Sequence, residues 1–171
     1  MGGRVIVVVM GVSGAGKTTV GRALAARLGW AFLDADDLHP AANVAKMAAG
    51  QPLTDTDRAP WLDAVAAHIA AWDAEGRSGV VACSALRRGY RDRLATACDG
   101  VRFVHLDVPP AIARERLAKR AGHFMPASLL DSQYATLEPI ADDERRRAVS
   151  LDATPPPADV VERACAWIAS A

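Results

Sequence analysis

The chain has 171 residues, 51% of them hydrophobic, a length that suits one domain (residues 1–171) with a core of its own. Its 20 Lys and Arg residues balance its 20 Asp and Glu residues, so nothing in the composition indicates a nucleic-acid-binding surface. The three cysteines are widely spaced and fit neither a disulfide framework nor a zinc site, and no signal-peptide pattern opens the chain, so we expect a cytoplasmic protein with no membrane partner.

The first expected element is a buried strand near residues 4–10. Residues 5–9 are all Val or Ile, and Met10 extends this apolar run. The next residues fit the phosphate-loop pattern G-x-x-x-x-G-K-[ST], and a helical apolar repeat follows over 19–28. Strand, glycine loop and helix form the context in which this pattern binds phosphate. The residues predicted to bind the nucleotide are Gly11, Ser13, Gly14, Ala15, Gly16, Lys17, Thr18 and Thr19.

The residue types of this loop explain the expected chemistry. Glycines let backbone N–H groups converge on a phosphate, and the following helix adds the partial positive charge of its N-terminus. Lys17 can reach the outer phosphates, and the hydroxyl of Thr18 is placed to ligate Mg²⁺. The alternative is a glycine-rich turn that binds nothing.

Further short apolar runs near 31–34, 79–83, 101–106 and 148–151 alternate with helical patterns, and a last helix is expected over 157–170. This alternation predicts an α/β fold with a parallel sheet. No internal repeat or linker divides the chain.

Two carboxylates, Asp34 and Asp36, follow the second expected strand. Ligands of open α/β sheets bind at this carboxyl edge, so Asp36 is a candidate to accept a proton from an attacking hydroxyl, and Asp34 to orient water or Mg²⁺. Both residues are equally suited to capping the next helix. The spacing does not choose between these readings.

The polar stretch 41–60 leads into a helix expected from about Ala59 to Glu75. Trp61, at its start, fits either the core or the wall of a pocket. Four arginines, Arg87, Arg88, Arg91 and Arg93, follow the third strand, whose end lacks the acidic residue common in nucleotide hydrolases. One or two of them are expected to bind carboxylate or phosphate, and the others to lie on a solvated helix face.

A basic segment at about 120–138 interrupts the strand–helix rhythm and is expected to form a lid that closes over the nucleotide. Within it, Arg120 is a candidate to stabilise charge on the moving phosphoryl group. The alternative is that Arg114, Arg116 and Arg120 simply pair with Glu115 and solvent.

Four blocks of residues go beyond these general patterns. They are GVSGAGKTT (11–19), FLDADDLHPAANVAKMAAGQPLTDTDRAPWL (32–62), CSALRRGYRDRL (83–94) and HF…SQYATLEP (123–139). Together they resemble the gluconokinase family of P-loop small-molecule kinases over nearly the whole length. The second block is the most specific, because it combines LHP, N-x-x-KM, G-x-PL-x-D-x-DR and PWL in one run.

The resemblance implies ATP-dependent phosphorylation of D-gluconate at its 6-hydroxyl, with ATP and Mg²⁺ as cofactors, and commonly a homodimer. It implies a nucleoside-monophosphate-kinase-like fold, a five-stranded parallel sheet flanked by helices with a lid. It also implies catalytic roles for Lys17, Asp36 and Arg120, and metal contacts from Thr18 and Asp34. The substrate-binding residues it implies, mostly within 36–62, are Asp36, His39, Lys46, Asp57, Arg58, Trp61, Arg88, Arg91, His123 and Gln133.

Two other functions remain compatible with the phosphate loop. A kinase of the same fold could act on shikimate, a nucleoside monophosphate or another small hydroxylated metabolite, and the second block argues against it. The second alternative is a non-catalytic nucleotide switch. Three features argue against a switch: the loop lysine, the pair Asp34 and Asp36, and the basic lid.

Overall fold

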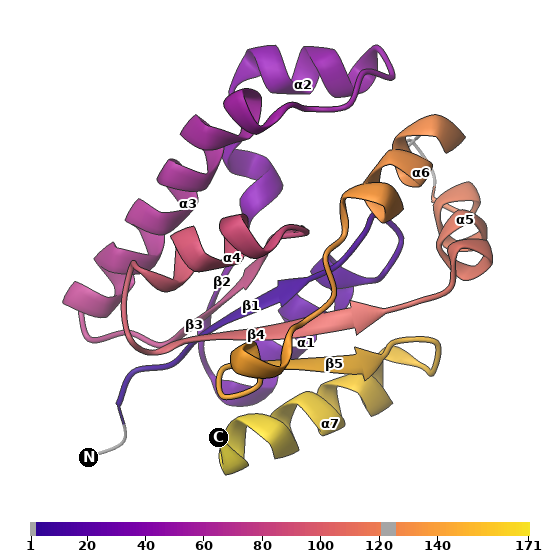
Figure 1. Cartoon of the computed structure of the whole chain (residues 1–171). Coiled ribbons are helices and arrows are strands. Elements are labelled where there is room, and N and C mark those ends of the chain that lie inside the picture. The colour runs from indigo at the N-terminus through magenta and orange to yellow at the C-terminus, as the bar shows by residue number, and fades with distance from the viewer. Residues whose placement is uncertain (1–2, 121–125) are drawn as a thin grey trace.

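The computed structural model describes residues 3–120 and 126–171, and it has the α/β architecture that the alternating pattern predicts (Figure 1). The strands are β1 (Ile6–Met10), β2 (Ala31–Asp34), β3 (Gly79–Ala82), β4 (Val101–Asp107) and β5 (Ala148–Asp152). The helices are α1 (Lys17–Leu28), α2 (Ala41–Ala48), α3 (Asp55–Ala74), α4 (Arg88–Ala95), α5 (Pro110–Ala118), α6 (Ala127–Thr136) and α7 (Pro157–Ser170). Two short 3₁₀ turns, η1 (Ala35–Leu38) and η2 (Asp142–Glu144), complete the set.

The five strands form one parallel sheet in the order β2-β3-β1-β4-β5. β1 is central, and Val8 pairs with Val81 on one side and Phe103 on the other. Every residue of β1 is buried, as expected for a strand covered on both faces of a parallel sheet. The phosphate loop therefore leaves the sheet at its centre.

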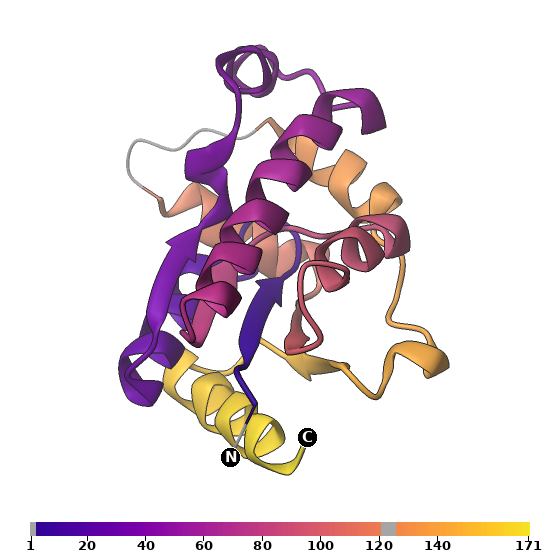
Figure 2. The ribbon, with the colours of Figure 1, turned by 90° about the vertical axis from the view of Figure 1, so that its left-hand side faces the viewer.

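Two apolar layers hold the sheet between its helices. Residues of α1 and α7 pack with one face, and residues of α3 and α4 pack with the other. Figure 2 views the molecule from the side of α3, with α7 beneath the sheet. Burial of these side chains is the main stabilising term of such a fold, at about 25 cal/mol per Å² of apolar surface removed from water.

The polar stretch after β2 is more structured than the sequence indicated. It contains α2, and α3 begins at Asp55 rather than near Ala59. The earlier start has a local cause, because the Thr54 side chain accepts from the Asp57 N–H while the Asp57 carboxylate accepts from the Thr54 N–H. This capping box stabilises the first turn, so Pro60 lies beyond the first turn of the helix rather than at its start.

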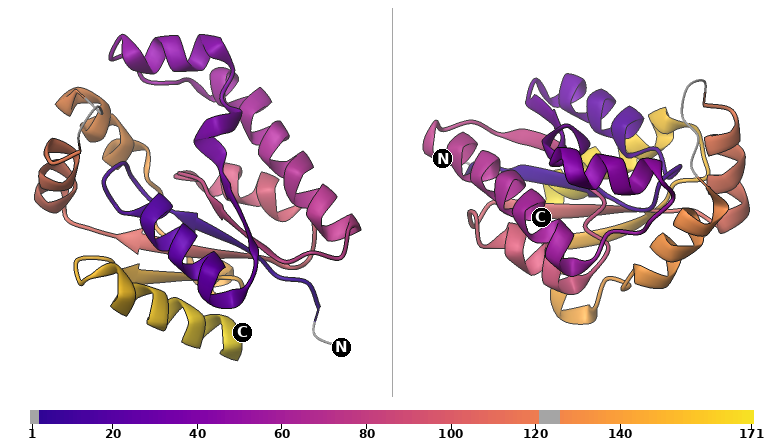
Figure 3. Two further views of the ribbon diagram at one scale, coloured as in Figure 1. Left: turned by 180° about the vertical axis from the view of Figure 1, so that it is seen from behind. Right: turned by 90° about the horizontal axis from the view of Figure 1, so that it is seen from above.

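The helices α5 and α6 lie beyond the carboxyl ends of β1 and β4, and α2 lies above the N-terminal end of α3 (Figures 1 and 3). These helices surround the edge at which the phosphate loop emerges. Among the residues that the structure describes, none of the helices has the length and apolar character needed to span a bilayer.

Candidate active site

The loop between β1 and α1 adopts a conformation that its glycines permit. Gly14 has φ +83°, and a Cβ there would lie 2.6 Å from the carbonyl oxygen of Ala113 in α5. Gly16 has φ +96° and forms the N-cap of α1. Gly11 anchors the start of the loop, where its N–H donates to the Ser84 carbonyl. Glycine is therefore required at Gly14 both for the backbone angle and for the close approach of α5.

The N-terminus of α1 faces the loop without a capping side chain, since its N-cap is a glycine. Such a helix end presents free N–H groups and a partial positive charge to an anion. The ammonium of Lys17, the first helical residue, donates to the Val12 carbonyl at 3.0 Å. Burial lowers the pKa of Lys17, although the carboxylates of Asp36 and Asp34 act in the opposite direction. The arrangement is suited to receive phosphate groups.

Asp34 connects the loop to the end of β2. One of its carboxylate oxygens accepts from the Thr18 hydroxyl at 2.8 Å, and the other accepts from the Asp36 N–H at 3.0 Å. Asp34 therefore caps the turn η1, as the alternative reading expected, and it also contacts Thr18 of the phosphate-loop helix. Asp36, two residues after Asp34, is exposed and lines a cavity that opens over the phosphate loop.

A cavity of about 840 Å³ opens over the loop, within the range typical of small-molecule sites. It brings together many of the residues predicted from the sequence, namely Ser13–Thr19, Asp34, Asp36 and the exposed Arg120. Gly11, by contrast, lies at the base of the loop and does not line the cavity.

The rest of the cavity wall was not predicted. Arg116 of α5 donates to the carbonyls of Ala15 at 3.2 Å and Ala153 at 2.7 Å, so it links the phosphate loop to the segment after β5. The tract Pro155–Pro157 also lines the cavity, directly after the residues that Arg116 contacts. From sequence, this tract indicated only the start of a helix. Its position directly after a parallel strand was the available signal, because ligands bind at that edge.

Trp61 belongs to the core and also supports a polar side chain. It is 1% exposed, and its indole N–H donates to the Ala35 carbonyl at 2.7 Å. The His39 ring stacks on its face, with centroids 4.1 Å apart and an interplanar angle of 14°. His39 Nε2 lies 4.0 Å from a carboxylate oxygen of Asp36. Stacking on the Trp61 indole thus positions the His39 imidazole beside Asp36.

Lys46 and Asp57 form an ion pair at 2.7 Å between α2 and the first turn of α3. Hydrogen bonds from the Lys46 ammonium and from the Thr54 N–H lower the pKa of Asp57 to about 2. This pair ties α2 to α3.

Arg58, a residue predicted to bind substrate, contacts Tyr90 of α4. Its guanidinium donates to the Tyr90 hydroxyl at 3.1 Å, and that hydroxyl donates to Asp55 in a short hydrogen bond. Arg87 lies 3.8 Å from the same carboxylate. Of the four arginines after β3, Arg87 is therefore connected to Arg58 through Asp55 and Tyr90.

Gln133 of α6 contacts the phosphate loop directly. Its side-chain oxygen accepts from the Ser13 N–H at 2.7 Å, and its amide nitrogen donates to the Ser13 hydroxyl at 3.1 Å. Gln133 belongs to the predicted lid at 120–138, so this part of the lid segment is hydrogen-bonded to the phosphate loop. His123, also predicted to bind substrate, lies outside the described residues.

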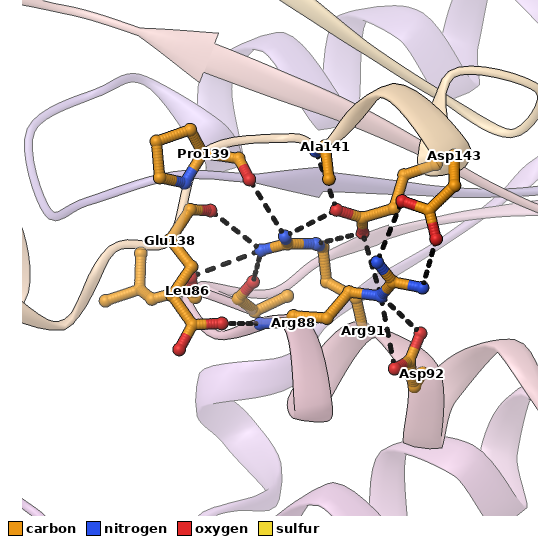
Figure 4. Close-up of polar contacts among 10 residues, drawn as sticks. Leu86, Arg88, Arg91, Asp92, Glu138, Pro139, Ala141 and Asp143 are labelled. Carbon is orange, nitrogen blue, oxygen red and sulfur yellow. Dashed lines mark hydrogen bonds and ion pairs between the residues drawn. The ribbon is translucent and has the colours of Figure 1, made fainter.

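Arg88 and Arg91, both predicted to bind substrate, lie elsewhere (Figure 4). Arg91 is 1% exposed, forms a two-point ion pair with Glu144, and donates to the carbonyls of Ala85, Leu86, Glu138 and Pro139. Arg88 binds Asp92 and Asp143. Their donors are held by partners that the sequence pattern did not reveal, and neither arginine lines the phosphate cavity, so their substrate roles remain predictions.

Replacing Arg91 with alanine is expected to reduce the free energy of unfolding by about 3–5 kcal/mol, because it leaves the Glu144 carboxylate buried without its cation. Burial alone raises the pKa of Glu144, and the hydrogen bonds from Arg91 and the Ala141 N–H outweigh it and lower that pKa. The contribution is therefore present at neutral pH and is lost as the pH falls through the lowered value. Chemical denaturation at pH 7 measures it.

The matched control is Arg93→Ala, which removes an arginine from the same helix but breaks an exposed ion pair with Asp63, worth at most about 1 kcal/mol. Equal destabilisation by the two substitutions would contradict a structural role specific to Arg91.

A family model described as "AAA domain" matches residues 6–140. In agreement with the resemblance carried by the four sequence blocks, the gluconokinase of Gluconobacter oxydans is 55% identical over 137 residues, covering 80% of this chain and 77% of that protein. A gluconokinase structure from Sinorhizobium meliloti has a TM-score of 0.87 at 44% identity, covering 97% of this chain and 92% of that one. An unliganded sugar kinase structure from a Janibacter species has a TM-score of 0.91 at 47% identity, covering 97% and 95%. Matches of this extent place the chain among the P-loop proteins of that model, and within them it belongs to the gluconokinase family.

Proposed function

We propose that this protein transfers the γ-phosphoryl group of ATP to the 6-hydroxyl of D-gluconate, giving 6-phospho-D-gluconate. The observation that carries the proposal is the position of Asp36. Its carboxylate faces the phosphate cavity on one side and lies 4.0 Å from His39 on the other. A carboxylate between a phosphate site and a cluster of polar side chains is placed to hold an acceptor hydroxyl in line with the γ-phosphate.

The nucleotide would bind with its phosphates over Ser13–Thr19. The N–H groups at the start of α1 and the Lys17 ammonium supply the positive potential. The base would lie in the remaining part of the cavity, between Arg116 and the tract Pro155–Pro157. Arg116 is already fixed there by carbonyl hydrogen bonds, so its planar guanidinium offers a flat surface to an aromatic ring.

Thr18 and Asp34 fit the requirements of Mg²⁺. Their oxygens are 2.8 Å apart and belong to the hard donor class that this ion prefers. Within the described part of the chain, no cluster of three or more His, Cys, Asp or Glu side chains suits a metal ion. Mg²⁺ commonly binds through one or two protein oxygens together with substrate phosphates. When bound, the ion neutralises charge on the β- and γ-phosphates.

Gluconate is an open-chain polyol with a carboxylate, and the polar groups around His39 match both features. Arg58 is the cation best placed for the carboxylate, with Arg87 beside the same cluster. Asp36 and His39 are placed for hydroxyls. We retain Lys46, Asp57 and Trp61 in the site as the groups that position these ligands, and Gln133 as a contact of the phosphate loop.

In the reaction itself, Asp36 orients the acceptor hydroxyl and accepts its proton as the new O–P bond forms. Lys17, and Arg120 from the proposed lid at 120–138, offset the charge on the phosphoryl oxygens. Arg120 is exposed at the cavity wall, and inward movement of the segment around it would bring its guanidinium closer to the phosphate.

The test of this function is ADP release by the purified protein with ATP and Mg²⁺. D-gluconate is expected to stimulate release strongly, whereas shikimate, a nucleoside monophosphate and a reaction without acceptor are not. Stimulation by another acceptor would retain the fold and mechanism and remove gluconate as the substrate. ATP binding without stimulation by any acceptor would favour a nucleotide switch.

The assembly and location are also proposals, supported by the family resemblance. We propose a cytoplasmic homodimer in which each chain is one kinase domain. Light scattering of the purified protein should give twice the 18.0 kDa chain mass. A monomer that remains fully active would remove the dimer from the proposal.

A further inference from the structure

Asn43 of α2 is a polar side chain that is almost entirely buried, with 4% of its surface exposed. Its amide nitrogen donates to the Asp57 carbonyl oxygen at 2.9 Å and lies 3.3 Å from His39 Nδ1. A carbonyl oxygen can only accept a hydrogen bond, so the contact with Asp57 establishes which end of the amide is the nitrogen. The second N–H of the same group then points at the imidazole.

This contact determines the protonation of His39. Because Asn43 donates to Nδ1, that nitrogen accepts, and in the neutral ring the proton is on Nε2. Burial lowers the pKa of His39, Asp36 opposes this shift, and Arg58 of α3 adds to it, so the neutral form predominates at pH 7. Stacking on Trp61 fixes the plane of the ring. The ring thus has one tautomer and one orientation.

We propose that Asn43 is a positioning residue that holds His39 as the Nε2–H tautomer, with this N–H directed at the space beside Asp36 where a substrate hydroxyl binds. The choice of a polyol hydroxyl as the occupant rests on the proposed function. The statement about the tautomer does not, since it follows from contacts within the protein.

The geometry at Asp36 suits a hydroxyl between the two groups. His39 Nε2 and the Asp36 oxygen are 4.0 Å apart, too far for a direct hydrogen bond. An oxygen about 2.8 Å from each atom fits beside the line that joins them. A hydroxyl at this position accepts a hydrogen bond from Nε2–H and donates one to the carboxylate. Its donor and its acceptor are thus both used. In the Nδ1–H tautomer, by contrast, the Nδ1–H of His39 and the side-chain N–H of Asn43 would be two donors facing each other.

Asn43 is not itself placed to bind substrate. Both of its N–H groups are used within the protein, and the side chain is enclosed between α2 and the start of α3. Its effect on catalysis therefore passes through His39. This distinguishes it from the exposed polar residues of the same sequence block.

The first experiment measures the tautomer directly, by long-range ¹H–¹⁵N NMR of the ligand-free full chain labelled in its four histidines. His39→Gln assigns the His39 signals. The wild-type protein is expected to show a protonated Nε2 and an unprotonated Nδ1 at pH 7. Asn43→Asp is expected to protonate Nδ1. A wild-type Nδ1–H tautomer, or signals unchanged by Asn43→Asp, would overturn the proposal.

The second experiment compares two replacements of His39 itself. The amide nitrogen of glutamine reaches the position of Nε2, and that of asparagine reaches the position of Nδ1. His39→Gln is therefore expected to retain at least tenfold more kcat/KM for D-gluconate than His39→Asn. Equal activity of the two variants, or the reverse order, would contradict an Nε2–H donor.

The third experiment follows kcat/KM against pH. A carboxylate at position 43 stabilises the imidazolium, so Asn43→Asp is expected to move the acidic limb upward by about one pH unit, a roughly tenfold loss on that limb. Val44→Asp is the control, because it adds the same charge to the same helix at a residue that is 51% exposed. Identical profiles for the two variants would contradict the coupling. If gluconate is not the acceptor, the wild type also fails in both kinetic assays, while NMR still decides the tautomer.

Discussion

Replacing Lys17 with alanine is expected to lower kcat with D-gluconate by roughly 10²–10³-fold, the usual effect of removing one preorganised group that stabilises transition-state charge. The ammonium lies at the start of α1 beside the phosphate cavity, where burial lowers its pKa and raises the strength of its interaction with an anion. Its protein contact is one hydrogen bond to the Val12 carbonyl, which a phosphate can replace. Steady-state ADP release at saturating gluconate measures the change.

The fold should tolerate this substitution. A partly desolvated ammonium that forms no ion pair within 4 Å among the described residues contributes little to stability, so the melting temperature of Lys17→Ala should stay within a few degrees of the wild type. Lys119→Ala is the control, because that lysine is 74% exposed and pairs only with Glu115 four residues earlier among the ion pairs of the described chain. A Lys17→Ala protein that melts normally and turns over like the wild type would remove Lys17 from the mechanism.

Replacing Asp36 with asparagine is expected to lower kcat by about 10²–10⁴-fold, the range associated with loss of a general base. The carboxylate is exposed, and within the described residues only His39 lies near enough to be counted as its ion-pair partner, at 4.0 Å. The substitution therefore removes charge without breaking a network, and thermal unfolding should change little. Asp63→Asn removes an exposed carboxylate from α3 that pairs with Arg93, and it should leave both properties unchanged.

A comparison with Asp36→Ala separates the two roles of this carboxylate. The amide oxygen of Asn still accepts a hydrogen bond from a hydroxyl, but it does not take its proton. If Asp36 serves as a base, asparagine and alanine should lower kcat about equally. If it mainly orients the hydroxyl, asparagine should retain clearly more activity. Wild-type turnover in both variants would place the acceptor hydroxyl elsewhere.

The parts of the site that were predictable from sequence are those formed by neighbours in the chain. The run from Gly11 to Thr18 joins a strand to a helix, so its N–H groups and Lys17 must converge at one point. Asp34 and Asp36 follow the next strand, and parallel strands end at one edge of the sheet. The fold class follows in the same way from short apolar runs that alternate with helical repeats.

The roles of the arginines depended on partners distant in sequence. Arg91 pairs with Glu144, 53 residues later, and Arg88 with Asp143, 55 residues later. Nothing in their spacing distinguished their environments from that of Arg87, which lies 3.8 Å from Asp55 instead. Arg116 likewise meets the tract after β5 only because α5 and α7 flank the same edge of the sheet.

The sequence by itself therefore determined the phosphate loop, the acidic edge of β2 and the parallel fold, because each arises from backbone geometry within a few residues. Only the tertiary structure decided which polar side chains remain available to a ligand. A charged or amide group in a folded chain forms hydrogen bonds with the partner that packing brings within about 3 Å. The spacing of residues along the sequence does not identify that partner. Asn43 illustrates this, because its two acceptors, His39 and Asp57, lie on different elements that meet only in the folded protein.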